Sequence, residues 1–302
     1  MKIFDTKKGL FKMTMEAEKK GTLSSIPFIL ISPLLSLIPG IVVGLLLAFT
    51  IGYSEEYLND FFQFNLLQYT SGAILIYYLI AEFKEKRSFF TLGLPLNKNI
   101  FLKYLIGFLI GIIMLSVIAL TIVSLGCGKI SFNKINTNFS DIISYIYVLI
   151  SWIILGASEE IMVRGYMFPS IAVKKGVIFS ILLTSIYFGL IHITGKGVNF
   201  IAIFNLSLFG ILDCLYAIYE ESIWGVCALH AAWNFCQGNI FGFIVSGDIV
   251  GGGSLFKTGI IDVNIINGGI FGPEASIITT IVIIIAIVII LVLQRKKYNK
   301  EE

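Results

Sequence analysis

Long apolar segments dominate this chain and restrict it to very few folds. Eight segments approach the length of a membrane-spanning helix, which needs about 20 apolar residues. They cover residues 25–52, 61–82, 101–126, 142–158, 177–194, 198–219, 222–245 and 275–293. Only 14% of the 302 residues are charged, against about a quarter in soluble domains. The pattern excludes a water-soluble enzyme and predicts an all-α polytopic membrane protein of about eight transmembrane helices.

The distribution of Lys and Arg predicts the orientation of the chain. With both termini in the cytoplasm, the inner segments hold 18 of the 22 basic residues, as the positive-inside rule requires. This divides the chain into a basic cytoplasmic segment (1–24), one transmembrane domain (25–293) and a cytoplasmic tail (294–302). The abundance of Ile, Lys and Asn favours a bacterial plasma membrane. The lipid bilayer is the expected partner, and a net charge of only +3 gives no support to a nucleic-acid partner.

Ionisable side chains within the apolar segments are the candidates for function, because they are costly in hydrocarbon unless paired or hydrated. The fourth segment ends in a cluster that contains Glu159, Glu160 and Arg164. Glu160 and Arg164 are four residues apart and can form an ion pair on one helix face. Glu159 points about 100° away, which leaves it as a free carboxylate. A solvated charge patch beside the membrane is the alternative.

Both histidines of the chain lie in apolar segments. His192 follows Phe188 by four residues, and Asn234 follows His230 by the same spacing, so each pair shares a helix face. Bonds between neighbouring helices would also account for them. Asp213, within the sixth segment, has no evident partner in the sequence and receives no role.

Together these groups predict a hydrolytic site in a polar cavity within the membrane. A carboxylate can act as general base, and imidazoles can be acid–base partners or metal ligands. The amide of Asn234 can stabilise an oxyanion. The segment limits place Glu159 near the inner face and His192 nearer the outer face, so convergence requires at least one limit to be wrong.

These residues resemble the motifs of the intramembrane protease family that includes the type II CAAX prenyl endopeptidase and the bacterial CPBP (bacteriocin-processing, Abi) proteins. The pattern EExxxR, FxxxH, HxxxN is complete and in order between about residues 140 and 245, the expected catalytic core. The resemblance implies an eight-helix bundle with a conical cavity. It also implies that Glu159 activates water with His192, while His230 and Asn234 stabilise the oxyanion. Glu160, Arg164 and Phe188 would support them.

The resemblance leaves the metal and the substrate open. Glu159, His192 and His230 could bind zinc or another divalent metal, but a ligating Glu159 could not also be the free base. The substrate would be a membrane-associated peptide, prenylated or bearing a bacteriocin-type leader.

Other functions are less well supported by the sequence. Ser246 lacks the glycine pattern of a serine hydrolase, and an aspartyl mechanism needs a second intramembrane aspartate besides Asp213. A transporter would show symmetric broken helices, which are not evident. A non-catalytic scaffold or a bacteriocin immunity protein that retains the motifs is the main alternative. The glycine-rich segment 246–274 receives no role.

Overall fold

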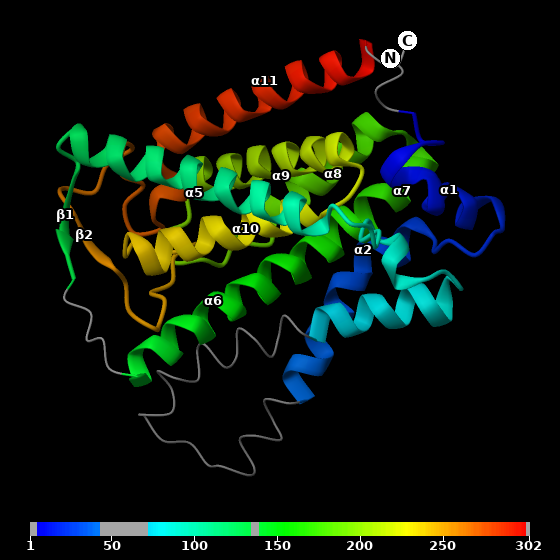
Figure 1. Cartoon of the computed structure of the whole chain (residues 1–302), viewed down its shortest axis with the longest axis horizontal. Coiled ribbons are helices and arrows are strands. Elements are labelled where there is room, and N and C mark those ends of the chain that lie inside the picture. Colours follow the sequence, from blue (N-terminus) through cyan, green and yellow to red (C-terminus); the bar gives the residue numbers. More distant parts are fainter. Residues whose placement is uncertain (1–4, 43–71, 134–138, 300–302) are drawn as a thin grey trace.

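The computed structural model describes residues 5–42, 72–133 and 139–299 and is mainly a bundle of helices (Figure 1). The helices are α1 (Lys12–Lys19), α2 (Ile26–Leu35), α5 (Ile100–Ser124), α6 (Phe139–Glu160), α7 (Phe168–Lys175), α8 (Val177–Leu190), α9 (Phe200–Glu220), α10 (Trp224–Phe235) and α11 (Ile277–Asn299). Short 3₁₀ turns are η2 (Gly9–Phe11), η4 (Phe89–Thr91) and η7 (Pro273–Ala275), and π-helical segments are η3 (Ile80–Lys84), η5 (Ile161–Met167) and η6 (Cys236–Ile240).

The prediction of eight spans is confirmed only in part. Within the described residues, four helices are long and apolar enough to cross a membrane: Ile100–Ser124, Tyr145–Lys175, Phe200–Glu220 and Ile277–Lys297. Ile26–Val42 and Val177–Leu190 are shorter apolar helices. The predicted spans 25–52 and 61–82 extend into residues 43–71, outside the described part. The predicted span 222–245 is too long, because α10 ends at Phe235 and the chain leaves helical structure after η6.

The predicted end of the fourth span at residue 158 is wrong. One helix continues from Tyr145 to Lys175 through the π-helical segment η5. The sequence suggested an end here because charges begin at Glu159. Two of those charged side chains, Glu160 and Arg164, are fully buried inside the bundle and paired, so they do not mark the membrane surface. Glu159 therefore lies in the interior of a long helix.

α10 lies at the centre of the bundle, between α5 and α6. Glycines make both approaches possible. A Cβ atom at Gly107 of α5 would overlap the carbonyl oxygen of Gly225, and one at Gly156 of α6 would lie 2.9 Å from the amide nitrogen of Ala231. Small residues permit such close contact between helices in membranes. These two contacts fix the position of α10, which carries His230 and Asn234.

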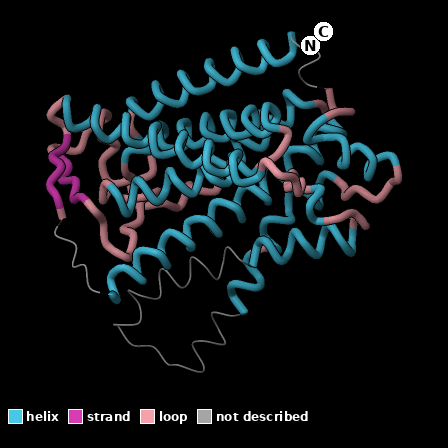
Figure 2. The backbone as a smooth tube through the Cα atoms, in the orientation of Figure 1, coloured by secondary structure: helices cyan, strands magenta, loops and turns pink. Residues whose placement is uncertain are grey.

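A small antiparallel sheet closes one end of the bundle (Figure 2). Strand β1 (Gly128–Phe132) pairs with β2 (Phe256–Ile260), with Ile130 opposite Thr258. The all-α prediction needs this correction. Each strand has only five residues and lies in a segment that reads as a loop, and the partners are more than 100 residues apart in the sequence.

The N-terminal segment and the end of α11 lie together at the opposite end of the bundle (Figure 1). Gly9 packs against the side chain of Glu221, which also accepts a 3.0 Å hydrogen bond from Lys297 Nζ. Both ends of the described chain therefore lie at the same end of the bundle.

Candidate active site

Arg164 is the centre of a buried charge cluster. Its Nη1 donates to Glu160 Oε1 at 2.9 Å, which is the predicted ion pair. Its Nη2 lies 3.2 Å from Asp213 Oδ2 on α9. Arg164 is therefore the partner of Asp213 that the sequence did not identify. All three side chains are fully buried, and charges at such depth are tolerated only when paired.

His230 is held by this cluster. Its Nδ1 lies 2.8 Å from Glu160 Oε1, and a carboxylate that also binds Arg164 acts as the acceptor. The proton is then on Nδ1, which leaves Nε2 with a free lone pair. That nitrogen lies 4.0 Å from Glu159 Oε2. Glu160 thus fixes the tautomer of His230, and Glu159 faces the ring from the other side.

His192 is held in a similar way by its own backbone. It lies in the turn after α8, not inside a helical span as predicted. Its Nδ1 lies 2.9 Å from the carbonyl oxygen of Phe188, which can only accept, so Nδ1 carries a proton and Nε2 is the nitrogen left for other contacts. The ring of Phe188 contacts both imidazoles edge-on, with centroid distances of 5.2 Å to His192 and 5.9 Å to His230. Phe188 therefore separates the two histidines and orients them.

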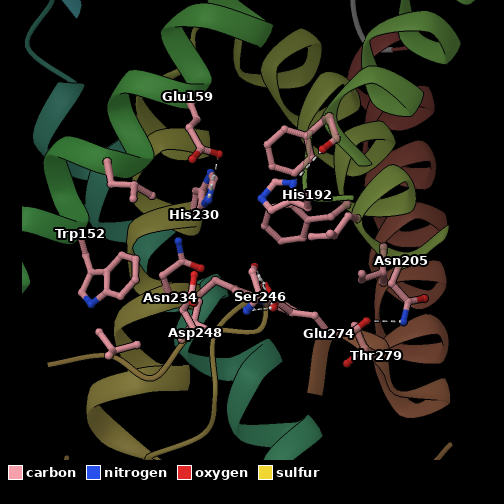
Figure 3. Close-up of a pocket in the computed structure, with 18 residues that line it drawn as sticks. Trp152, Glu159, His192, Asn205, His230, Asn234, Ser246, Asp248, Glu274 and Thr279 are labelled. Carbon is pink, nitrogen blue, oxygen red and sulfur yellow. Dashed lines mark hydrogen bonds and ion pairs between the residues drawn. The ribbon is translucent and has the colours of Figure 1, made fainter. Parts of the chain in front are cut away.

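One cavity of about 150 Å³ brings the predicted residues together (Figure 3). Glu159, His192, His230 and Asn234 all line it. Asn234 is only 6% exposed, and Glu159 Oε2 accepts no hydrogen bond from the described residues. Because Glu159 is inside a long helix, the apparent difference in depth between it and His192 disappears. The volume is enough for several water molecules.

The opposite wall of the cavity contains polar residues that the sequence did not assign to the site: Asn205, Ser246, Asp248, Glu274 and Thr279. Ser246 and Glu274 are hydrogen-bonded to each other. The one signal in the sequence was an acidic residue, Glu274, directly before the last apolar segment. No Lys or Arg is among the residues that line the cavity.

The possible metal ligands do not form a compact set. Among the described residues, no three His, Cys, Asp or Glu side chains are grouped so that they could hold a metal ion. Glu159 Oε2 and His230 Nε2 lie 4.0 Å apart. Zinc or another divalent metal bound by Glu159, His192 and His230 therefore stays a prediction.

Comparison with known proteins gives one match. Residues 141–236 match the family model described as type II CAAX prenyl endopeptidase Rce1-like. No curated protein and no solved structure matches the chain. The matched segment includes the four predicted catalytic residues and ends before Ser246, Asp248 and Glu274.

Proposed function

Because residues 141–236 belong to the Rce1-like family of type II CAAX prenyl endopeptidases, a family of intramembrane proteases, we propose that this chain is an endopeptidase of the membrane. It would hydrolyse a peptide bond with water activated by Glu159 and His192. The observation that supports this most is the shared cavity, where a carboxylate oxygen without a partner among the described residues lies with two histidines whose Nδ1 atoms are already held by acceptors.

The proposed mechanism assigns a role to each of the four side chains. Water donates a hydrogen bond to Glu159 Oε2, which takes its proton as the oxygen attacks the peptide carbonyl. His192 Nε2 accepts the second hydrogen of the water and orients it. The amide of Asn234 stabilises the oxyanion of the tetrahedral intermediate, together with the imidazolium of His230, which forms when Nε2 takes up a proton from bulk water before the attack. Glu159 then passes its proton to the leaving amine.

The supporting residues act through His230. Glu160 accepts the hydrogen bond of His230 Nδ1 and is itself held by Arg164. Arg164 lies over the ring of Phe188, 4.3 Å from its centroid. These contacts restrict the orientation of both histidines, which is the pre-organisation that hydrolysis requires.

The proposed substrate is a membrane-associated peptide. The candidates remain a prenylated C-terminus and a leader-bearing precursor of bacteriocin type. Assays in proteoliposomes with quenched fluorescent peptides of both kinds distinguish them, because each peptide is either cut or left intact. A scaffold or immunity protein with the same motifs would cut neither.

The test of the function compares Glu159→Gln with Glu160→Gln. We expect Glu159→Gln to fold normally and to lower kcat by about 10²–10⁴, the usual contribution of a general base. Glu160→Gln should instead lower the amount of folded protein, because it leaves Arg164 with a weaker partner. Glu221→Gln is the matched control, since this glutamate is exposed and lies at the end of α9. Full cleavage by folded Glu159→Gln protein would refute the proposal.

A further inference from the structure

The wall of the cavity opposite Glu159 comes from a part of the chain that the family match does not cover. Glu274 belongs to η7, just before α11, and Ser246 and Asp248 belong to the segment that follows η6. All three line the same cavity as the two histidines (Figure 3). The proposed mechanism uses none of them.

Glu274 is a buried carboxylate that is fixed in place. It is only 4% exposed. Its Oε2 accepts hydrogen bonds from the backbone nitrogen of Ser246 at 2.6 Å and from Ser246 Oγ at 3.0 Å. Ser246 has a left-handed backbone, with φ of 48°, and its N–H and its hydroxyl donate to the same carboxylate oxygen. These bonds orient Glu274 but do not neutralise it.

No lysine or arginine among the described residues that line the cavity balances this group. Buried carboxylates are normally paired, yet Glu274 forms no ion pair within 4.0 Å among the described residues. Asp248, which is exposed, forms none there either. Among the described residues, three carboxylates line the cavity, those of Glu159, Asp248 and Glu274, and no Lys or Arg does. Burial raises the pKa of Glu274 above its ordinary value, and nearby His192 and the bonds from Ser246 only oppose that rise.

The amide that the proposed mechanism assigns to the oxyanion is a second feature of this cavity that indicates a polar ligand. The side chain of Asn234 faces the same cavity, is 6% exposed and makes no hydrogen bond within the described structure. A buried amide of this kind costs free energy unless something pairs with it. Apolar side chains also line the cavity, including Trp152, Val245 and Val250, and can cover an aliphatic stem.

We propose that Glu274, oriented by Ser246 and assisted by Asp248, forms a subsite for the positive charge of a peptide substrate. The charge would be that of a lysine or arginine side chain close to the bond that is cut. A metal ion is the less suitable occupant, since no three donor side chains are grouped in the described residues. The inference rests on the proposed function, because it assigns a substrate preference to the same cavity.

The test measures binding without cleavage. Two of the three tryptophans, Trp152 and Trp233, line the cavity, so Trp224→Phe leaves a fluorescence signal from the site alone. In a Glu159→Gln background, the probes are N-acetylated, C-amidated Ala-Ala-Lys-Ala-Ala and the same peptide with norleucine in place of lysine. We expect the lysine peptide to bind at least roughly tenfold more tightly, as a desolvated charge pair does.

Variants of Glu274 and Asp248 test whether this part of the cavity causes the preference for the lysine peptide. Glu274→Gln keeps the acceptor for Ser246 and should reduce the ratio of the two Kd values to about two or less. Asp248→Asn should reduce this ratio partially. Because Asp248 is exposed, this variant still tests the proposal if Glu274→Gln misfolds. Glu221→Gln should leave the ratio unchanged. Equal binding of the two peptides, or a preference that survives Glu274→Gln, would overturn the subsite.

Two further results separate the possible failures. A fluorescence response to ZnCl₂ that displaces the lysine peptide and is lost in Glu274→Gln would show a metal site and overturn the proposal. Cleavage by the wild-type protein is measured with peptides of both kinds. A lysine preference in binding without any cleavage would support the subsite and remove the proposed function, whereas cleavage without the preference would remove only the subsite.

Discussion

Arg164 carries two carboxylates, Glu160 and Asp213, in a region without solvent. In such a cluster, loss of one acid should lower the free energy of unfolding less than loss of the base. Without Asp213 one balanced pair remains, but without Arg164 two buried acids face each other. Removal of a partner from a buried pair costs about 3–5 kcal/mol. The cluster therefore keeps Glu160, and through it His230, in one arrangement.

We predict that Arg164→Leu lowers the free energy of unfolding in detergent micelles by about 3–5 kcal/mol. Asp213→Asn should cost clearly less, because Glu160 still balances Arg164. Unfolding by increasing SDS fraction, followed by circular dichroism, measures both. Arg295→Leu is the control, since Arg295 is exposed on α11. Equal losses for Arg164→Leu and Asp213→Asn would contradict this view of the cluster.

At the scale of helices, the sequence predicted contacts within one element better than contacts between elements. The spacing of Glu160 and Arg164 and that of His230 and Asn234 follow from helical geometry alone. The position of Glu159 inside a long helix could not be predicted from the sequence. A charged residue in an apolar segment indicates the end of a span unless its partner is known. The partner of Asp213 lies on another element, which its own spacing could not indicate.

The contact between Ser246 and Glu274 could not be predicted from the sequence either, because it also joins separate parts of the chain. The two residues are 28 positions apart in a glycine-rich segment without helical or strand periodicity. Their contact depends on how the segment folds back against the bundle. The short strands β1 and β2, which pair between distant loops, were missed on these grounds as well.

The contact between α5 and α10 gives a prediction at this scale. Gly107→Ala would place a Cβ atom in overlap with the Gly225 carbonyl, so the helices must separate. Overpacking of this kind costs about 1–3 kcal/mol, and because α10 carries His230 and Asn234, cleavage should fall as well. Thermal unfolding and peptide cleavage measure the two effects. Gly259→Ala in β2 is the matched control, because its nearest neighbour lies at 3.9 Å. Unchanged behaviour of Gly107→Ala would contradict the close approach of the two helices.

Across the whole molecule, charge is distributed between two ends. Basic side chains that include Lys174 and Lys297 lie at the end that holds α1 and the C-terminal part of α11, where they bind Glu18 and Glu221. The opposite end carries the β1–β2 sheet and few basic residues. Large apolar side chains cover the outward faces of α5 and α11 between these ends. This is the arrangement of a membrane protein with one basic face.

The positive-inside rule then gives the orientation. We predict that cysteines introduced at Lys20 and Lys296, in a Cys127→Ser background, react with a membrane-impermeant maleimide only in inside-out vesicles. A cysteine at Lys257 in β2 should react only from the outer side of intact cells. The three remaining cysteines are buried and should contribute little background. Labelling of positions 20 and 296 from opposite sides would contradict their common location at one end of the bundle. Labelling of both positions from outside would show that the protein has the opposite orientation. The basic end would then lie outside the cell, contrary to the positive-inside rule.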